Sequence, residues 1–68
     1  MNATKLNRRI TEYMHERGIT QAQFAAETGI SRKTLYNART GNGLTLESAF
    51  LIAKKLGVTL DDLYCMTH

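Results

Sequence analysis

Hydrophobic residues recur along this chain at the spacing of a helix, and glycines interrupt the pattern at short intervals. In the first segment the apolar positions fall at i, i+4, i+7 and i+8 and are Leu6, Ile10, Tyr13 and Met14. Gly18 follows them as a left-handed C-terminal stop, and Gly29 and Gly57 end two later segments in the same way. The pattern therefore predicts a series of short amphipathic helices.

Small polar residues stand where each later helix would begin: Thr20, Ser31, Thr45 and Thr59. Such side chains accept a hydrogen bond from a backbone N–H of the first turn. The chain contains no proline and shows no convincing strand alternation. We predict an all-α fold with helices over approximately residues 4–17, 21–28, 32–39, 46–56 and 60–66. Since 68 residues leave room for only one core, we expect residues 1–68 to form a single domain.

The stretch TQAQFAAETGISRKTLYNAR, from Thr20 to Arg39, resembles one long helix except for Gly29 at its centre. A glycine inside a helix costs about 1 kcal/mol relative to alanine. Here it is followed by hydrophobic Ile30 and then Ser31, a good cap, so Gly29 is predicted to end one helix and Ser31 to begin the next. A short connection containing glycine is typical of a helix-turn-helix, whose helices cross at roughly 90 to 120°.

Positive charge is concentrated in two parts of the chain, although the net charge is only +3. The first eleven residues contain no acid, and their basic residues are Lys5, Arg8 and Arg9. The stretch Thr28–Leu46 also contains no acid, and its basic residues are Arg32, Lys33 and Arg39. On composition alone, two explanations of this charge are equally good: it keeps a small protein soluble, or it binds an anionic partner.

Several other functions are disfavoured by the residue inventory. No apolar run is long enough to span a membrane, and the single cysteine, Cys65, cannot form an internal disulfide, so we expect a cytoplasmic protein with no membrane partner. Met1 at the start and the lack of a linker favour a complete chain. Cys65 and His68 could share a metal, but structural zinc needs four ligands and His15 is the one histidine left to add.

Catalytic chemistry is disfavoured for a similar reason. Apart from Asp61 and Asp62 the chain has no paired carboxylates, and these two are neighbours on a helix, so their side chains diverge. We expect no catalytic residues, no metal, no cofactor and no small-molecule ligand.

The order of residues around Gly29 resembles the helix-turn-helix of the Cro and lambda-type phage repressors and their bacterial XRE-family relatives. The residues that carry the resemblance are Gln21, Ala25, Gly29, Ile30, Ser31, Thr34 and Leu35. The later LTLESAFLIAKKLGVTLDDLY is similar to the family's fourth and fifth helices. The resemblance covers nearly the whole chain and implies a compact five-helix, lambda-repressor-like DNA-binding domain. Its third helix would enter the DNA major groove while the second lies across the backbone.

The resemblance also implies which side chains read DNA bases: Arg32, Lys33, Asn37 and Tyr36. Arginine and lysine can donate to guanine, asparagine can pair with adenine, and tyrosine can meet a thymine methyl group or a phosphate. The alternative is an ordinary solvated helix face, with Tyr36 packed flat against the first helix.

A second set of residues is expected at DNA phosphates: Gln21, Ser31, Thr34, Arg39, Asn42 and Thr45. Gln21 matches the residue that in this family bonds a phosphate and braces the recognition helix, and free backbone N–H groups at helix starts could bind phosphates as well. Many family members carry an acid where Arg39 stands and a more basic loop around Asn42. This departure weakens the expectation of a minor-groove contact from the loop.

Apolar residues late in the chain suggest a homodimer, at least on DNA. The family's usual dimer surface lies around the fifth helix, which places Val58, Leu60, Leu63 and Tyr64 there, shared between the core and the partner. On the fourth helix, Phe50 falls near the edge of the buried face and Leu51 nearly opposite it, so Leu51 is expected to be exposed. Phe50 is counted with the dimer surface, whereas Leu51 is equally well explained as a scattered surface hydrophobe.

Two classes of function follow from these observations. The first is a sequence-specific regulator of transcription that binds double-stranded DNA, most simply a phage or bacterial repressor that binds a palindromic operator as a dimer. The alternative is a protein-interaction module on the same fold, such as an antitoxin or antirepressor. The acid-free basic stretch favours the first.

Overall fold

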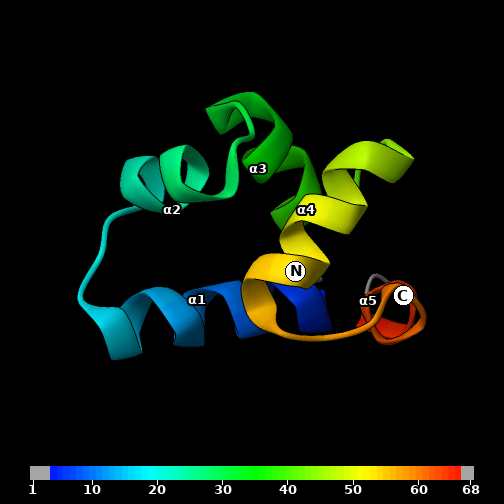
Figure 1. The fold of residues 1–68 in the computed structure, drawn as a ribbon, viewed down its shortest axis with the longest axis horizontal. Helices are drawn as coiled ribbons and strands as arrows, with labels where there is room; N and C mark the ends of the chain where they lie inside the picture. Colours follow the sequence, from blue (N-terminus) through cyan, green and yellow to red (C-terminus); the bar gives the residue numbers. More distant parts are fainter. Residues whose placement is uncertain (1–3, 67–68) are drawn as a thin grey trace.

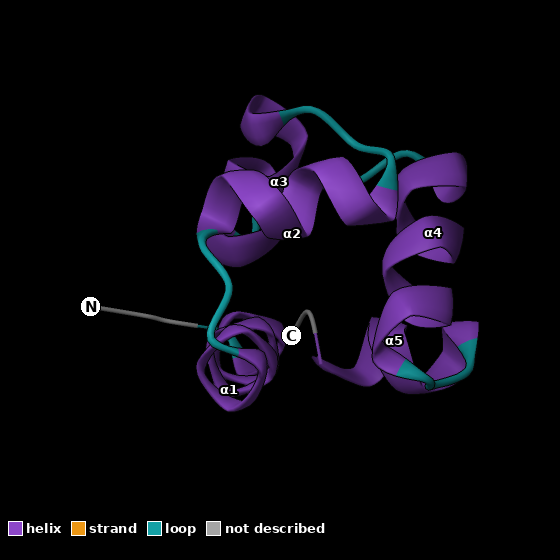
Figure 2. Ribbon diagram, turned by 60° about the vertical axis from the view of Figure 1, so that its left-hand side comes forward, coloured by secondary structure: helices purple, strands orange, loops and turns teal. Residues whose placement is uncertain are grey.

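The computed structural model describes residues 4–66, and within this range the chain forms five α-helices and no strand (Figures 1 and 2). The helices are α1 (Lys5–Arg17), α2 (Gln21–Thr28), α3 (Arg32–Thr40), α4 (Leu46–Leu56) and α5 (Leu60–Met66). The first begins one residue later than predicted because Thr4 is its cap, and the third ends one residue later because Gly41 is its stop. Met1 and His68 lie outside the described residues.

The helix starts form as their polar residues predict. Thr20, Ser31 and Thr45 each accept a hydrogen bond from the backbone N–H three residues later, at 3.1, 3.0 and 3.1 Å. Thr59 accepts one from the N–H of Asp62 in the same way, at 3.1 Å. The side chain of Gln23 also accepts a hydrogen bond from the N–H of Thr20, which completes a capping box at the start of α2.

Gly29 separates α2 from α3, as the sequence predicts. Its φ of 86° is left-handed, a conformation that glycine adopts without the steric penalty of a Cβ atom. The N–H groups of Gly29 and Ile30 both bond the carbonyl of Ala25, at 2.9 and 3.1 Å, and Ser31 then caps α3. Ala25 is almost fully buried at this corner, and Ile30 packs against the core beside it. The two helices therefore form a helix-turn-helix.

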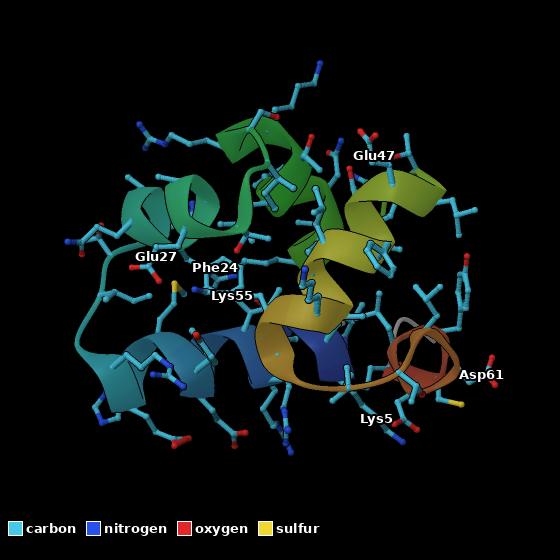
Figure 3. All side chains as sticks on the ribbon, in the orientation of Figure 1. Lys5, Phe24, Glu27, Glu47, Lys55 and Asp61 are labelled. Carbon is cyan, nitrogen blue, oxygen red and sulfur yellow. The ribbon has the colours of Figure 1, made fainter. Side chains whose placement is uncertain are left out.

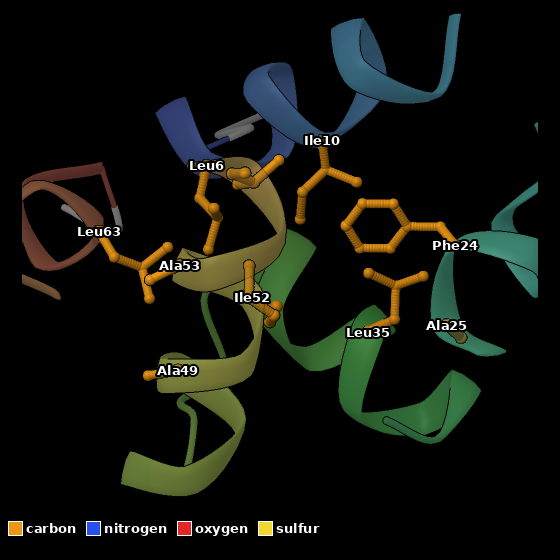
Figure 4. Close-up of a cluster of buried hydrophobic side chains, with 11 residues drawn as sticks. Leu6, Ile10, Phe24, Ala25, Leu35, Ala49, Ile52, Ala53 and Leu63 are labelled. Carbon is orange, nitrogen blue, oxygen red and sulfur yellow. The ribbon is translucent and has the colours of Figure 1, made fainter. Parts of the chain in front are cut away.

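Phe24 is the one fully buried aromatic side chain among the described core residues. Its ring lies between Ile10 of α1 and Leu35 of α3, and all three side chains are fully buried (Figure 4). Tyr13 meets the ring edge-on, with centroids 5.5 Å apart. The other buried hydrophobic residues are Leu6, Ala25, Ala38, Ala49, Ile52, Ala53, Leu56 and Leu63. Since every helix contributes to this cluster, α3 is held by side chains from the whole domain.

An ion pair ties α4 to α2 at the surface beside this core. Lys55 lies 2.9 Å from the carboxylate of Glu27, and Figure 3 shows the two side chains meeting. The hydrogen bond to Glu27 holds the pKa of Lys55 above its ordinary value. The Lys55 ammonium also lies 6.0 Å from the centroid of the Tyr13 ring, so α1 shares in the contact.

The expectation for Leu51 was wrong. Its side chain is half-buried and borders a hollow together with Tyr13 and Thr28, because the end of α2 packs over this side of α4. The exposed apolar residues of α4 are instead Leu46 and Phe50, which are one helical turn apart and so share a face.

Truncation of the Phe24 side chain tests this description of the core. We expect Phe24→Ala to lower the free energy of unfolding by about 3 to 5 kcal/mol, because it removes buried contacts and leaves a cavity. Tyr36→Ala removes an exposed aromatic ring and should change it by less than about 0.5 kcal/mol. Urea unfolding followed by circular dichroism measures both, and similar losses in the two variants would contradict the assignment.

Candidate nucleic-acid interface

The outward face of α3 carries free basic and aromatic side chains. Arg32, Lys33 and Tyr36 are exposed, and none of these side chains forms a hydrogen bond or ion pair with a described residue. Tyr36 is 59% exposed, so it does not pack flat against α1. Leu35 and Ala38 are buried on the opposite face and fix the orientation of the helix. The three outward side chains are therefore available to a partner.

Asn37 occupies a different environment from these three residues. Its side chain is half-buried and borders a hollow of about 310 Å³ between α3, the following loop, α4 and α5. Leu44 and Tyr64 border the same hollow. Of the four predicted base-reading residues, Asn37 is thus the least exposed to a partner that approaches α3 from outside.

The polar side chains at the helix starts are partly used within the protein. The Ser31 hydroxyl accepts the capping bond and donates to the Thr34 hydroxyl at 2.8 Å, and Thr45 donates to Ser48 at 3.0 Å. Thr34 and Ser48 each accept this bond, so their own protons can be donated outward. Ser48 was not among the predicted phosphate-binding residues. Its position three residues after the capping residue Thr45 is the sequence signal that places a second hydroxyl group at the start of α4.

Arg39 does not point away from the domain with the other basic residues of α3. Its half-buried guanidinium reaches back across the fold and donates three hydrogen bonds. The acceptors are Asn7 Oδ1 at 2.6 Å, Gln21 Oε1 at 2.6 Å and Thr11 Oγ1 at 2.9 Å. Arg39 therefore joins α3 to both α1 and α2.

The three acceptors of Arg39 are all neutral. The ion pair between Lys55 and Glu27 is the one salt bridge among residues 4–66, so no carboxylate neutralises the guanidinium. Asn7 and Thr11, which sequence reasoning missed, are 32 and 28 residues from Arg39. Their i, i+4 spacing places them on one polar face of α1, but only the fold reveals what that face meets.

The remaining predicted phosphate-binding residues lie around these features. Gln21 is half-buried at the start of α2, and its bond to Arg39 links it to α3. Asn42 is exposed in the loop after α3, where its backbone N–H bonds the carbonyl of Asn37 at 3.0 Å. Thr45 caps α4 at the end of the same loop.

The predicted dimer residues divide into two groups. Phe50 and Tyr64 are 54% and 48% exposed, and Val58 and Leu60 are half-buried. Leu63 is fully buried in the core, so its side chain is closed to a partner in this conformation. The surface open to a second protomer is therefore smaller than the sequence pattern indicates.

The described residues hold no group of three or more histidine, cysteine, aspartate or glutamate side chains that could bind a metal. Cys65 and His15 are exposed, and His68 lies outside the described range. None of the helices in residues 4–66 has the length and apolar character of a membrane span.

Comparison with known proteins agrees with this geometry. A family model described as helix-turn-helix matches residues 10–63, more than half of the chain, whereas no curated protein and no solved structure matches. The fold and the match define a helix-turn-helix DNA-binding domain, which is not an enzymatic class. The chain belongs to the XRE family of helix-turn-helix proteins and is a DNA-binding regulator of that type. The resemblance drawn from the sequence is thereby confirmed.

The bonds of Arg39 predict an effect on folding that its neighbours do not share. We expect Arg39→Ala to lower the free energy of unfolding by about 1 to 3 kcal/mol, because three hydrogen bonds, two of them partly buried, are lost. Arg39→Lys should retain only part of the free energy of unfolding that Arg39→Ala loses. An ammonium group lacks the planar guanidinium geometry that reaches three acceptors. Chemical unfolding of both variants gives the values.

Arg32→Ala is the matched control, because Arg32 lies on the same helix without a hydrogen-bond partner. It should change the free energy of unfolding by less than about 0.5 kcal/mol. Equal effects of Arg32→Ala and Arg39→Ala would refute the bracing role of Arg39.

Proposed function

We propose that this protein is a sequence-specific regulator of transcription that represses by binding a palindromic DNA operator as a homodimer in the cytoplasm. The observation that carries the proposal is the outward face of α3, where Arg32, Lys33 and Tyr36 are exposed and make no side-chain bond to the protein. No acid lies between Thr28 and Leu46, so nothing along this stretch repels a phosphate backbone. Occupancy of the operator excludes polymerase.

Base recognition is assigned to the side chains that α3 carries outward. Arg32 and Lys33 lie in its first turn, where a recognition helix meets the edges of the bases, and each can donate to guanine O6 and N7. Tyr36, one turn later, can meet a thymine methyl group. Asn37 is assigned a supporting contact with adenine, since its half-buried side chain reaches out less far.

Phosphate contacts are assigned to the residues that flank α3. Ser31 and Thr34 lie at its start, Asn42 and Thr45 lie in the loop that follows it, and Gln21 lies at the start of α2. Unpaired backbone N–H groups at these helix starts favour an anion. Arg39 contributes positive charge, although its bonds within the protein limit its reach.

The homodimer is assigned to the surface formed by Val58, Leu60, Tyr64 and Phe50. Val58 precedes α5, Leu60 and Tyr64 lie on α5, and Phe50 lies on α4. Each of these side chains is at least partly exposed. Leu63 supports this surface from within the core. The dimer would give two recognition helices, one for each half of a palindrome.

A second function, a protein-interaction module such as an antitoxin or antirepressor, is favoured by one observation. Leu46 and Phe50 are large, exposed and apolar, and they share a face of α4. Such a module has no need of an acid-free basic face on α3, so DNA regulation is the better proposal.

The experiment that tests the proposed function is selection of bound sites from a random duplex library at near-physiological salt. We expect an enriched palindrome with half-sites about 10 base pairs apart, as two recognition helices of a dimer require. Sedimentation of the protein with the selected duplex should show two protomers. A single short site would refute the dimer, and no enrichment would favour the protein-interaction module.

The role of Arg32 is tested by its truncation. On the selected site we expect Arg32→Ala to weaken binding by about 1 to 3 kcal/mol and to relax the preference at one base pair. Arg9→Ala is the control, because Arg9 is an exposed arginine that lies on α1 and not on α3. It borders a hollow of the surface to which no residue of α3 contributes. Affinity for the site and its single-base variants gives the result. Loss of affinity that is equal for all sequences would show that Arg32 does not read a base.

A further inference from the structure

The bonds of Arg39 fix which atoms of its neighbours face outward. A guanidinium group can donate hydrogen bonds but cannot accept them. The amides of Asn7 and Gln21 must therefore turn their oxygens toward Arg39, as they do at 2.6 Å each, which leaves their NH₂ groups directed elsewhere. Thr11 likewise uses its oxygen as an acceptor, at 2.9 Å, and keeps its own proton to donate.

We term the resulting group of side chains the donor cluster; it consists of Asn7, Thr11, Gln21 and Arg39. It has more hydrogen-bond donors than its internal bonds use, and few free acceptors. The guanidinium has five N–H groups, and three are used, so two are left. Neither amide nitrogen bonds another described residue. Because no buried side-chain nitrogen or oxygen in residues 4–66 lacks a partner, both nitrogens reach solvent.

The electrostatic surroundings of the donor cluster also favour an anion. No salt bridge neutralises Arg39. Asn7 lies in the first turn of α1 and Gln21 is the first residue of α2, and neither first turn contains an acid. Helix starts carry partial positive charge, so the two helices add to the charge of the guanidinium.

We infer that the donor cluster is a phosphate-binding site, which extends the DNA interface from α2 and α3 onto α1. Its ligand is a backbone phosphate of duplex DNA, whose oxygens accept hydrogen bonds and carry negative charge. Arg39 acts mainly as a positioning residue, because it orients the two amides that donate to the phosphate. The inference rests on the proposed function for the identity of the ligand, and it adds Asn7 and Thr11 as contacts.

The test exploits the near-identical shape of amide and carboxylate side chains. Asn7→Asp and Gln21→Glu each keep an oxygen for Arg39 and form a stronger, charge-assisted bond with it, so the fold is preserved. Each removes a donor and places negative charge where the phosphate would bind. Gln23→Glu is the matched control, since Gln23 is exposed, lies two residues from Gln21 on α2, and keeps an acceptor for the Thr20 N–H as glutamate.

Affinity for a fixed duplex is measured by fluorescence anisotropy over a range of salt concentrations, with thermal unfolding of each variant. We expect Asn7→Asp and Gln21→Glu to weaken binding about tenfold or more, with unfolding midpoints equal to or above that of the unaltered protein. Gln23→Glu should weaken binding less than about threefold, because salt screens its charge. The salt slope should fall by about one in the first two variants.

Two outcomes would overturn the inference, and they are distinct from failure of the proposed function. Equal effects of Asn7→Asp and Gln23→Glu would show that only general repulsion acts and that α1 does not contact a phosphate. A titration with inorganic phosphate, followed by the side-chain amide NMR signals of Asn7 and Gln21, separates the two sources of phosphate. Saturation by free phosphate, with duplex affinity unchanged in the variants, would assign the cluster to a free anion. Failure of the unaltered protein to bind any duplex would refute the proposed function itself.

Discussion

The burial of Phe24 between Ile10 and Leu35 is the contact on which the rest of the domain depends. Helices α2 and α3 have eight and nine residues, too few to be stable alone in water. They persist because their apolar faces close around this ring. Packing in the core consequently fixes the orientation of α3. It thereby determines which side chains of α3 face solvent and can contact DNA.

Local features of the fold were predictable because their causes are local. A threonine or serine cap acts on the N–H three residues later, and a glycine stop acts on the preceding turn, so both can be identified in a short window of sequence. The corner at Gly29 and Ser31 followed from these rules alone. Order along the chain then sufficed to suggest the family.

The failures have a common physical origin in contacts between distant segments. Leu51 was expected to be exposed because a helical wheel considers α4 alone, whereas the end of α2 covers that side. The bonds of Arg39 within the protein were not predicted, because a charged side chain on a helix ordinarily faces water. The three acceptors of Arg39 lie 18 to 32 residues away, where no spacing rule applies.

The outward side chains of α3 contribute nothing to the bonds that hold the domain together. Arg32, Lys33 and Tyr36 have no partner within residues 4–66, whereas Arg39, Leu35 and Ala38 on the same helix are tied to the fold. Substitutions at the first three positions are therefore nearly free of folding cost. A lineage of such proteins can drift to new target sites one residue at a time, and an engineer can retarget the domain by randomising these positions without repairing its stability.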